Sequence, residues 1–270
     1  MYATAPEAAT VLSYISTTDN RADQPGLVSE RPRGLHVQQS TLQNRILRLL
    51  PTDSFAALAE AFEPIELPRA YVFSEPQKDS KYAYFPETGI GSIVAISPEG
   101  QQSEVGIFGR EGMSPAYLVL ETAMTPYSIF MQVPGAGYRI PNETLFAAAQ
   151  HDASLRRLLL RYAYVLSIQT AYTGLSNSIH HIDVRLARWL LMCHDRTRSD
   201  QFSLTHEFLA VMLSVRRSSV TNALHMLEGN HLIYSERSLI TIRDRKALED
   251  FAGDAYGIPE QEYSRLIGPL

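Results

Sequence analysis

The sequence predicts an α+β fold in three successive parts: a domain of short antiparallel strands, one long helix, and a compact segment of short helices with a β-hairpin. Three observations lead to this prediction. Turn residues interrupt β-prone runs about every ten residues between Ile65 and Tyr138. The spacing of apolar residues then becomes helical and stays so over His151–His181. In the last part, two short helical patterns with a tight connection precede a hairpin pattern.

The composition is that of a globular chain, because 45% of the 270 residues are hydrophobic and 20% are charged, enough for a core in one or two domains. The single cysteine, Cys193, excludes a disulfide framework or a multi-thiolate metal site within one chain. No stretch reaches the roughly 18 apolar residues of a membrane span, and the N-terminus lacks the pattern of a secretion signal. We therefore expect a cytoplasmic protein with no membrane partner.

The net charge of −5 is unevenly distributed along the chain. Residues 153–246 contain 13 Lys and Arg against 7 Asp and Glu, a balance of +6. The rest of the chain contains 11 against 22, a balance of −11. A basic C-terminal part on an acidic body indicates that the protein docks on a polyanion through that part only.

Residues 1–40 are rich in small, polar and turn-forming residues, which predicts a disordered tail. Helical spacing from Leu42, interrupted by Pro51 and resumed at Phe55, predicts a helical lead-in to the strands. Short strands separated by turns are typical of a β-sandwich or barrel, which we place within residues 41–150. The expected strands are Ala70–Phe73, Tyr82–Phe85, Ile90–Ile96, Glu104–Phe108, Tyr117–Leu120 and Tyr127–Val133.

The long helix, within residues 151–182, contains no proline and one glycine, Gly174. At about 1.5 Å per residue it extends beyond what a small sandwich covers, so we expect it to pair with a second copy of the chain. Packing on the chain's own strands is the alternative. The predicted dimer interface comprises Leu155, Leu158, Leu159, Tyr162, Val165, Leu166, Gln169 and Tyr172.

The order of elements in residues 183–253 is that of a winged helix-turn-helix, with a tight turn at Leu213–Val215 between its two central helices. We expect residues 254–270 to be a C-terminal tail. The expected elements are the helices Val184–Asp195, His206–Leu213, Ser218–Glu228 and Arg245–Ala252 and the strands Ile233–Ser235 and Leu239–Ile242.

The second central helix has an unusual polar face, which is free of acidic residues from Ser214 to Met226. A merely solvated face usually mixes Glu with Lys. Arginine can pair with guanine O6 and N7, asparagine with adenine N6 and N7, and hydroxyl groups suit phosphates. This face therefore predicts reading of double-stranded DNA in the major groove. With Val220, Ala223, Leu224 and Leu227 buried, the outward residues are Arg216, Arg217, Ser218, Ser219, Thr221 and Asn222.

Two further residues complete the predicted DNA contacts. Thr205 opens the first central helix, where its hydroxyl caps the helix and the free N–H groups suit a phosphate; capping alone is the alternative. Arg237 stands with Ser238 at the tip of the wing, where minor-groove or phosphate contact competes with a solvated turn. His225 lies near the reading face as a second-row or surface residue.

The order of parts over Thr41–Ala252 resembles the Crp/Fnr family of bacterial transcription regulators, most specifically in EFLAVMLSVRRSSVTNALHMLEGNHLI, residues 207–233. The resemblance implies a cyclic-nucleotide-binding-like β-roll or jelly roll as a sensor-like domain, a dimerisation helix and a winged helix-turn-helix. It places Arg217, Ser218 and Asn222 where the family reads bases. Ser218 stands where many members have an acidic residue, so the half-site preference should differ from theirs. Ser214 replaces the usual turn glycine.

The sensor-like domain departs from the family's cyclic-nucleotide binders. Those proteins use an arginine for the cyclic phosphate and a glutamate for the ribose, whereas no Lys or Arg occurs from Met113 to Tyr138 and the glutamate position falls at Pro115 or Ala116. A buried phosphate would lack its charge partner. We expect no cofactor and an effector other than cAMP. One cysteine cannot supply the four thiolates of an iron–sulfur cluster, and haem stays open.

No set of residues supports an enzyme, because the chain has no P-loop, G-x-S-x-G or HExxH motif. His180, His181 and His194 favour a polar hinge over a metal site, since adjacent histidines on a helix point in different directions. We expect a homodimer on inverted DNA half-sites, with RNA polymerase as a candidate partner. The alternative is a ligand- or protein-binding sensor module whose DNA domain is non-functional.

Overall fold

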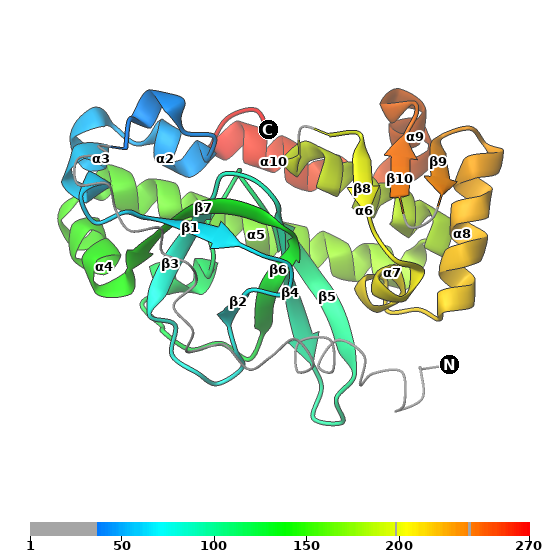
Figure 1. Ribbon diagram of the computed structural model, residues 1–270, viewed down its shortest axis with the longest axis horizontal. Helices are drawn as coiled ribbons and strands as arrows, with labels where there is room; N and C mark the ends of the chain where they lie inside the picture. Colours follow the sequence, from blue (N-terminus) through cyan, green and yellow to red (C-terminus); the bar gives the residue numbers. More distant parts are fainter. Residues whose placement is uncertain (1–36, 198, 237–238) are drawn as a thin grey trace.

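The computed structural model describes residues 37–197, 199–236 and 239–270 (Figure 1). Most of the predicted tail and the wing-tip residues Arg237 and Ser238 lie outside the described residues. The predicted α+β class is confirmed, with a β-roll before one long helix and a winged helix-turn-helix after it in the chain. No helix in the described part of the chain has the length and hydropathy that a membrane span requires.

Two antiparallel sheets form the roll, in the strand orders β1-β7-β3 and β2-β6-β4-β5. The strands are β1 (Glu63–Leu67), β2 (Val72–Ser74), β3 (Tyr82–Pro86), β4 (Ile90–Ile96), β5 (Gln102–Phe108), β6 (Ser128–Val133) and β7 (Gly135–Pro141). Buried aromatic and aliphatic side chains fill the space between the sheets, among them Phe73, Tyr84 and Phe108. This core makes the roll a packed domain.

Two expectations about the roll are wrong. Tyr117–Leu120, expected as a strand, belongs to the 3-10 helix η2 (Ala116–Leu120). Conversely, no strand was expected at β7, whose first residues Gly135–Gly137 have the composition of a turn but belong to the middle strand of its sheet. A side chain at Gly137 would collide with the backbone of Phe85 on the neighbouring strand. A glycine is therefore required where the two strands approach closely.

Short helices surround the roll. The predicted helical lead-in is divided into η1 (Gln39–Thr41), α2 (Arg45–Leu49) and α3 (Thr52–Ala59), and α4 (Asn142–His151) follows the last strand. Asn44 caps α2, because its side-chain oxygen accepts a hydrogen bond from the Leu47 N–H at 3.2 Å. Pro51 stands between α2 and α3, which explains the interruption in the sequence pattern.

The long helix is α5 (Ala153–Ile179), of 27 residues, which runs behind the roll in Figure 1. Asp152 caps it by accepting from Ser154 and Leu155 N–H, which separates it from α4. Five of the eight predicted interface residues are buried within the chain itself, so the prediction that these five face a second copy is wrong. They are Leu155, Leu159, Tyr162, Val165 and Gln169.

Gln169 shows why this face turns inward. Its side-chain oxygen accepts from the Ile107 N–H at 2.7 Å, and its side-chain nitrogen donates to the Ile107 carbonyl at 3.2 Å. Ile107 belongs to β5, an edge strand of the four-stranded sheet. The glutamine amide thus satisfies an otherwise exposed strand edge in place of a further strand.

The winged helix-turn-helix has the predicted order of elements, with ends that differ by at most two residues and with β8 as an additional strand. Its sheet has the order β8-β10-β9. The elements are α6 (Ile182–Arg196), β8 (Gln201–Ser203), α7 (His206–Met212), α8 (Arg217–Gly229), β9 (Ile233–Glu236), β10 (Leu239–Ile242) and α9 (Arg245–Ala252).

The C-terminal residues 254–270, expected as a tail, contain a docked helix, α10 (Ile258–Leu266), after the 3-10 turn η3 (Gly253–Ala255). Tyr263 is only 3% exposed and donates a hydrogen bond from its hydroxyl to the Glu111 carbonyl at 2.7 Å. Tyr263 and Leu266 lie three residues apart and join the core shared by α2 and α5. The expectation failed because so short an apolar stripe has little periodicity.

Candidate nucleic-acid interface

Helix α8 is anchored in the winged helix-turn-helix by one apolar side. The predicted inward residues Val220, Ala223, Leu224 and Leu227 are each no more than 4% exposed, and they pack in one core with α6, α7 and the small sheet. Because four residues at helical spacing are buried, the rotation of α8 about its axis is determined, and with it the side chains that face outward.

The outward face of α8 carries most of the predicted DNA-reading residues. Arg216, Arg217, Ser218 and Asn222 are exposed, while Ser219 and Thr221 are half-buried. The helix begins at Arg217, with Arg216 as the capping residue, and no side chain of the described residues caps its first N–H groups. The N–H group of Ser219 donates to the Arg216 carbonyl at 2.9 Å, whereas those of Arg217 and Ser218, at the positive end of the helix dipole, are open to an anion such as a DNA phosphate.

The turn between α7 and α8 rests on the roll. Ser214 has a φ of 52°, in the left-handed region where a glycine is usual, and this costs about 1 kcal/mol for a residue with a side chain. Its hydroxyl donates to the Ser103 hydroxyl on β5 at 2.7 Å, which offsets part of that cost. The helix-turn-helix is thus held against the same edge strand that Gln169 holds from α5.

The first turn of α7 reaches across to the outward face of α8 at two points. The Glu207 carboxylate lies 2.7 Å from Nε of Arg217, and Nδ1 of His206 lies 3.0 Å from the Thr221 hydroxyl. Sequence reasoning missed both contacts. The only local signal was the threonine before them, which marks the start of α7 and so places the next two residues on its first turn.

Thr205 acts as the cap of α7, because its hydroxyl oxygen accepts from the Phe208 N–H at 3.2 Å. Capping gives Thr205 a structural role in the protein without DNA. A phosphate contact by Thr205 stays a prediction. The predicted contact by Arg237 lies outside the described residues. His225 and Met226 are exposed on the same side of α8 as Asn222, toward the end of the helix.

A buried polar cluster connects the roll to α6. Nε1 of Trp189 donates to Glu104 at 2.6 Å, and Ser92 lies on the other side of this carboxylate at 2.7 Å. Burial raises the pKa of Glu104 to about 7, although both hydrogen bonds favour its charged form. Farther along α6, Arg196 and Glu111 form an ion pair at 2.8 Å in which both side chains are at most 5% exposed.

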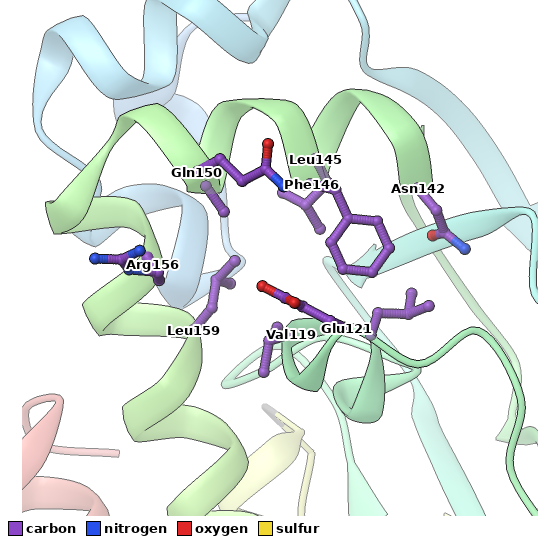
Figure 2. Close-up of a pocket in the computed structure, with 10 residues that line it drawn as sticks. Val119, Glu121, Asn142, Leu145, Phe146, Gln150, Arg156 and Leu159 are labelled. Carbon is purple, nitrogen blue, oxygen red and sulfur yellow. The ribbon is translucent and has the colours of Figure 1, made fainter.

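One small cavity lies at the edge of the roll. Figure 2 shows a cavity between η2, α4 and α5, with a volume of about 40 Å³. For comparison, an engineered cavity of about 150 Å³ holds one benzene molecule. The Glu121 carboxylate points into this cavity and the Arg156 guanidinium points away from it, an arrangement that disfavours an anion (Figure 2).

The histidines singled out in the sequence lie in separate hydrogen-bond networks. His180 contacts Ser176 and Asp254, each at 3.1 Å, where α5 ends. His194 lies 2.6 Å from both Asp200 and Arg245. Nowhere in the described residues do three His, Cys, Asp or Glu side chains gather in a group that could hold a metal ion.

Comparison with known proteins agrees with this geometry. Residues 184–251 match the family model of the Crp-like helix-turn-helix domain. No curated protein sequence matches the chain. Among solved structures, one described as a regulator of the Crp/Fnr family from Eubacterium rectale is 17% identical, with coverage of 75% of this chain and 95% of that chain and a TM-score of 0.60.

Two further structures are similar over the same extent. FixK2 from Bradyrhizobium japonicum is 14% identical, with coverage of 71% and 98% and a TM-score of 0.60. The c-di-GMP responsive regulator CLP from Xanthomonas campestris is 15% identical, with coverage of 72% and 100% and a TM-score of 0.55. At identities this low, structural similarity establishes the fold alone. The chain therefore carries a Crp-like helix-turn-helix domain at residues 184–251 and has the fold of the Crp/Fnr-type DNA-binding transcription regulators.

Proposed function

We propose that this protein is a sequence-specific transcription regulator that binds palindromic DNA sites as a homodimer and catalyses no reaction. The observation that carries the proposal is the outward face of α8, where Arg217, Ser218 and Asn222 are exposed above a fully buried apolar side. An arginine and an asparagine five residues apart, about 1.4 helical turns, match guanine and adenine edges in the major groove. RNA polymerase is the partner through which such a dimer would change transcription.

The exposed face of α5 supports the homodimer. Four large apolar side chains on it are 41% to 60% exposed: Leu160, Tyr164, Leu175 and Ile179. Their spacing keeps them on one side of the helix, opposite the side that packs on the roll. Apolar side chains at this exposure along a helix indicate a protein contact. Two copies joined along this face would present two α8 helices to half-sites about 34–36 Å apart.

The filled interior of the roll supports an effector other than a cyclic nucleotide. Phe73 stacks edge-on with Tyr84 and with Phe108, with ring centroids 4.9 Å and 5.3 Å apart. These rings belong to the buried core of the roll. A signal received by the roll has a direct route to the DNA domain, because β5 contacts both α5 and the turn before α8.

The DNA-binding proposal is tested by selecting duplexes from a random-sequence pool with the purified full-length protein. We expect an inverted-repeat motif, and we expect Arg217→Ala and Asn222→Ala to lose preference at defined base pairs. Arg48→Ala is the matched control, since Arg48 is exposed on α2 at the far end of the molecule (Figure 1). Salt-sensitive binding without any sequence preference would instead favour the sensor module with a non-functional DNA domain.

The homodimer is tested by sedimentation velocity on Tyr164→Asp, which places a charge in the exposed stripe of α5. We expect the wild type to sediment as a dimer and the variant as a monomer with unchanged helix content. A matched control is Tyr127→Asp, because Tyr127 is an exposed aromatic residue of the roll, 37% accessible and outside α5. A wild-type monomer in the presence of its selected duplex contradicts the homodimer.

A further inference from the structure

Arg217 is held by a residue of the preceding helix before any DNA is present. The Glu207 carboxylate contacts it at Nε, 2.7 Å away. Nε carries one of the five guanidinium N–H donors, and the two terminal nitrogens carry the other four. A contact at Nε therefore leaves the end of the guanidinium available for a bidentate contact with a guanine.

The pair stands at the surface that the DNA would occupy. The side chains of Arg217 and Glu207 are 66% and 52% exposed. Exposed ion pairs contribute about 0–1 kcal/mol to folding, so stability does not explain this one. Nor does crowding, because both side chains face solvent. A carboxylate placed beside a surface that binds a polyanion is unfavourable for affinity.

The position of Glu207 is set by the start of α7. The Thr205 cap fixes the first turn of the helix, and the positive end of the helix dipole favours a carboxylate there. The preceding residue, His206, contacts Thr221, which lies one turn beyond Arg217 on α8. Residues 214–226 contain no acidic side chain of their own. The carboxylate beside the reading face of α8 is thus supplied by the neighbouring helix.

We propose that Glu207 is a positioning residue that sets DNA specificity through Arg217: it aims the guanidinium at a base edge and keeps it from pairing with a phosphate. This inference rests on the proposed function. It implies that removing the carboxylate frees Arg217 to contact the backbone. Non-specific affinity then rises while discrimination between bases falls. A residue with a merely structural role would lower both together.

The test uses the full-length protein and the duplex selected above, with each base pair replaced in turn and a random-sequence duplex for non-specific binding. We expect Arg217→Ala to lower discrimination at one base pair by about 5- to 100-fold, the share of one bidentate contact. We expect Glu207→Gln to lower it at the same base pair by about 3- to 10-fold, as for coupled neighbours. The salt dependence of binding should steepen by up to about one charge, for one added phosphate contact.

Two comparisons make the result specific. Glu207→Gln should have no further effect on discrimination in the Arg217→Ala background. Asp250→Asn, which removes an exposed acid paired with Lys246 on α9, changes the net charge equally and should leave base preference unchanged. The inference is overturned if Asp250→Asn lowers base discrimination as much as Glu207→Gln does. It is also overturned if Glu207→Gln has the same effect on discrimination in the Arg217→Ala background, or if Glu207→Gln leaves discrimination and non-specific affinity unchanged. Unchanged preference in Arg217→Ala itself would instead remove this arginine from the proposed DNA interface.

Discussion

Glu104 predicts a specific pH dependence of stability. The residue is 4% exposed, and its carboxyl group lies at the contact between β5 and α6. The Ser92 hydroxyl lies 2.7 Å from this carboxyl and 2.5 Å from the side-chain oxygen of Gln132, but it has a single proton to donate. Either a proton on Glu104 or a Gln132 amide turned so that Nε2 faces Ser92 resolves this conflict, and Nε2 has no hydrogen-bond partner in its present position. Burial is the cause that raises the pKa of Glu104, and it outweighs the hydrogen bonds from Ser92 and Trp189.

The magnitude follows from the two pKa values of Glu104, about 7 when folded and 4.5 ordinarily. Because the folded state binds this proton more tightly, the stabilisation is complete below pH 4.5 and is lost as the pH rises toward 7. The free energy of unfolding should fall by about 3 kcal/mol over the whole titration of Glu104. About 2.5 kcal/mol of this loss should occur between about pH 5 and pH 8. Glu104→Gln has the shape of the neutral acid and cannot ionise, so it should lack this loss.

The assay is urea unfolding at several pH values, followed by the fluorescence of Trp189, the single tryptophan of the chain and a neighbour of Glu104. The difference between wild type and Glu104→Gln removes the contribution of other titrating groups, including Glu260, whose pKa is also raised by burial. Glu66→Gln, at an exposed position on β1, is the matched control. Parallel pH profiles for wild type and Glu104→Gln would refute the reasoning.

Three further substitutions test other parts of the structure, each by its free energy of unfolding in urea. Glu111→Gln leaves the buried Arg196 charge without its partner and should cost about 3–5 kcal/mol, whereas a cost below 1 kcal/mol would mean that the pair is solvated. Leu224→Ala empties a fully packed position under α8 and should cost about 2–5 kcal/mol; a neutral effect would contradict the packing of that helix. Tyr263→Phe removes one buried hydrogen bond to the roll and should cost about 1 kcal/mol, and no change at all would indicate that α10 is undocked in solution.

The sequence by itself determined the elements whose signals are local. The tight turn and the two short apolar patterns around it predicted α7 and α8 to within one residue at each end. The buried side of α8 followed from helical spacing, so the outward position of Arg217 and Asn222 followed as well. Turn residues at regular intervals were enough to predict an antiparallel β domain, because strand ends and turns depend on short-range backbone preferences.

Only the tertiary structure decided which of several apolar faces would be buried. Helix α5 has apolar residues on more than one side, and periodicity cannot rank them; the fit of Tyr162 and Gln169 against the roll selects one side and leaves Tyr164 on the other. The strand β7 was not predicted, because its glycines suggest a turn but instead allow the backbone of a neighbouring strand to approach closely.

The pairing of Glu207 with Arg217 was equally hidden, although the two residues are close in the chain. Their contact depends on how α7 crosses α8, and that crossing is set by the buried core beneath both helices and by the β5 edge on which the turn rests. Local patterns therefore determined the reading helix of this protein, whereas long-range packing decided which carboxylate stands beside it.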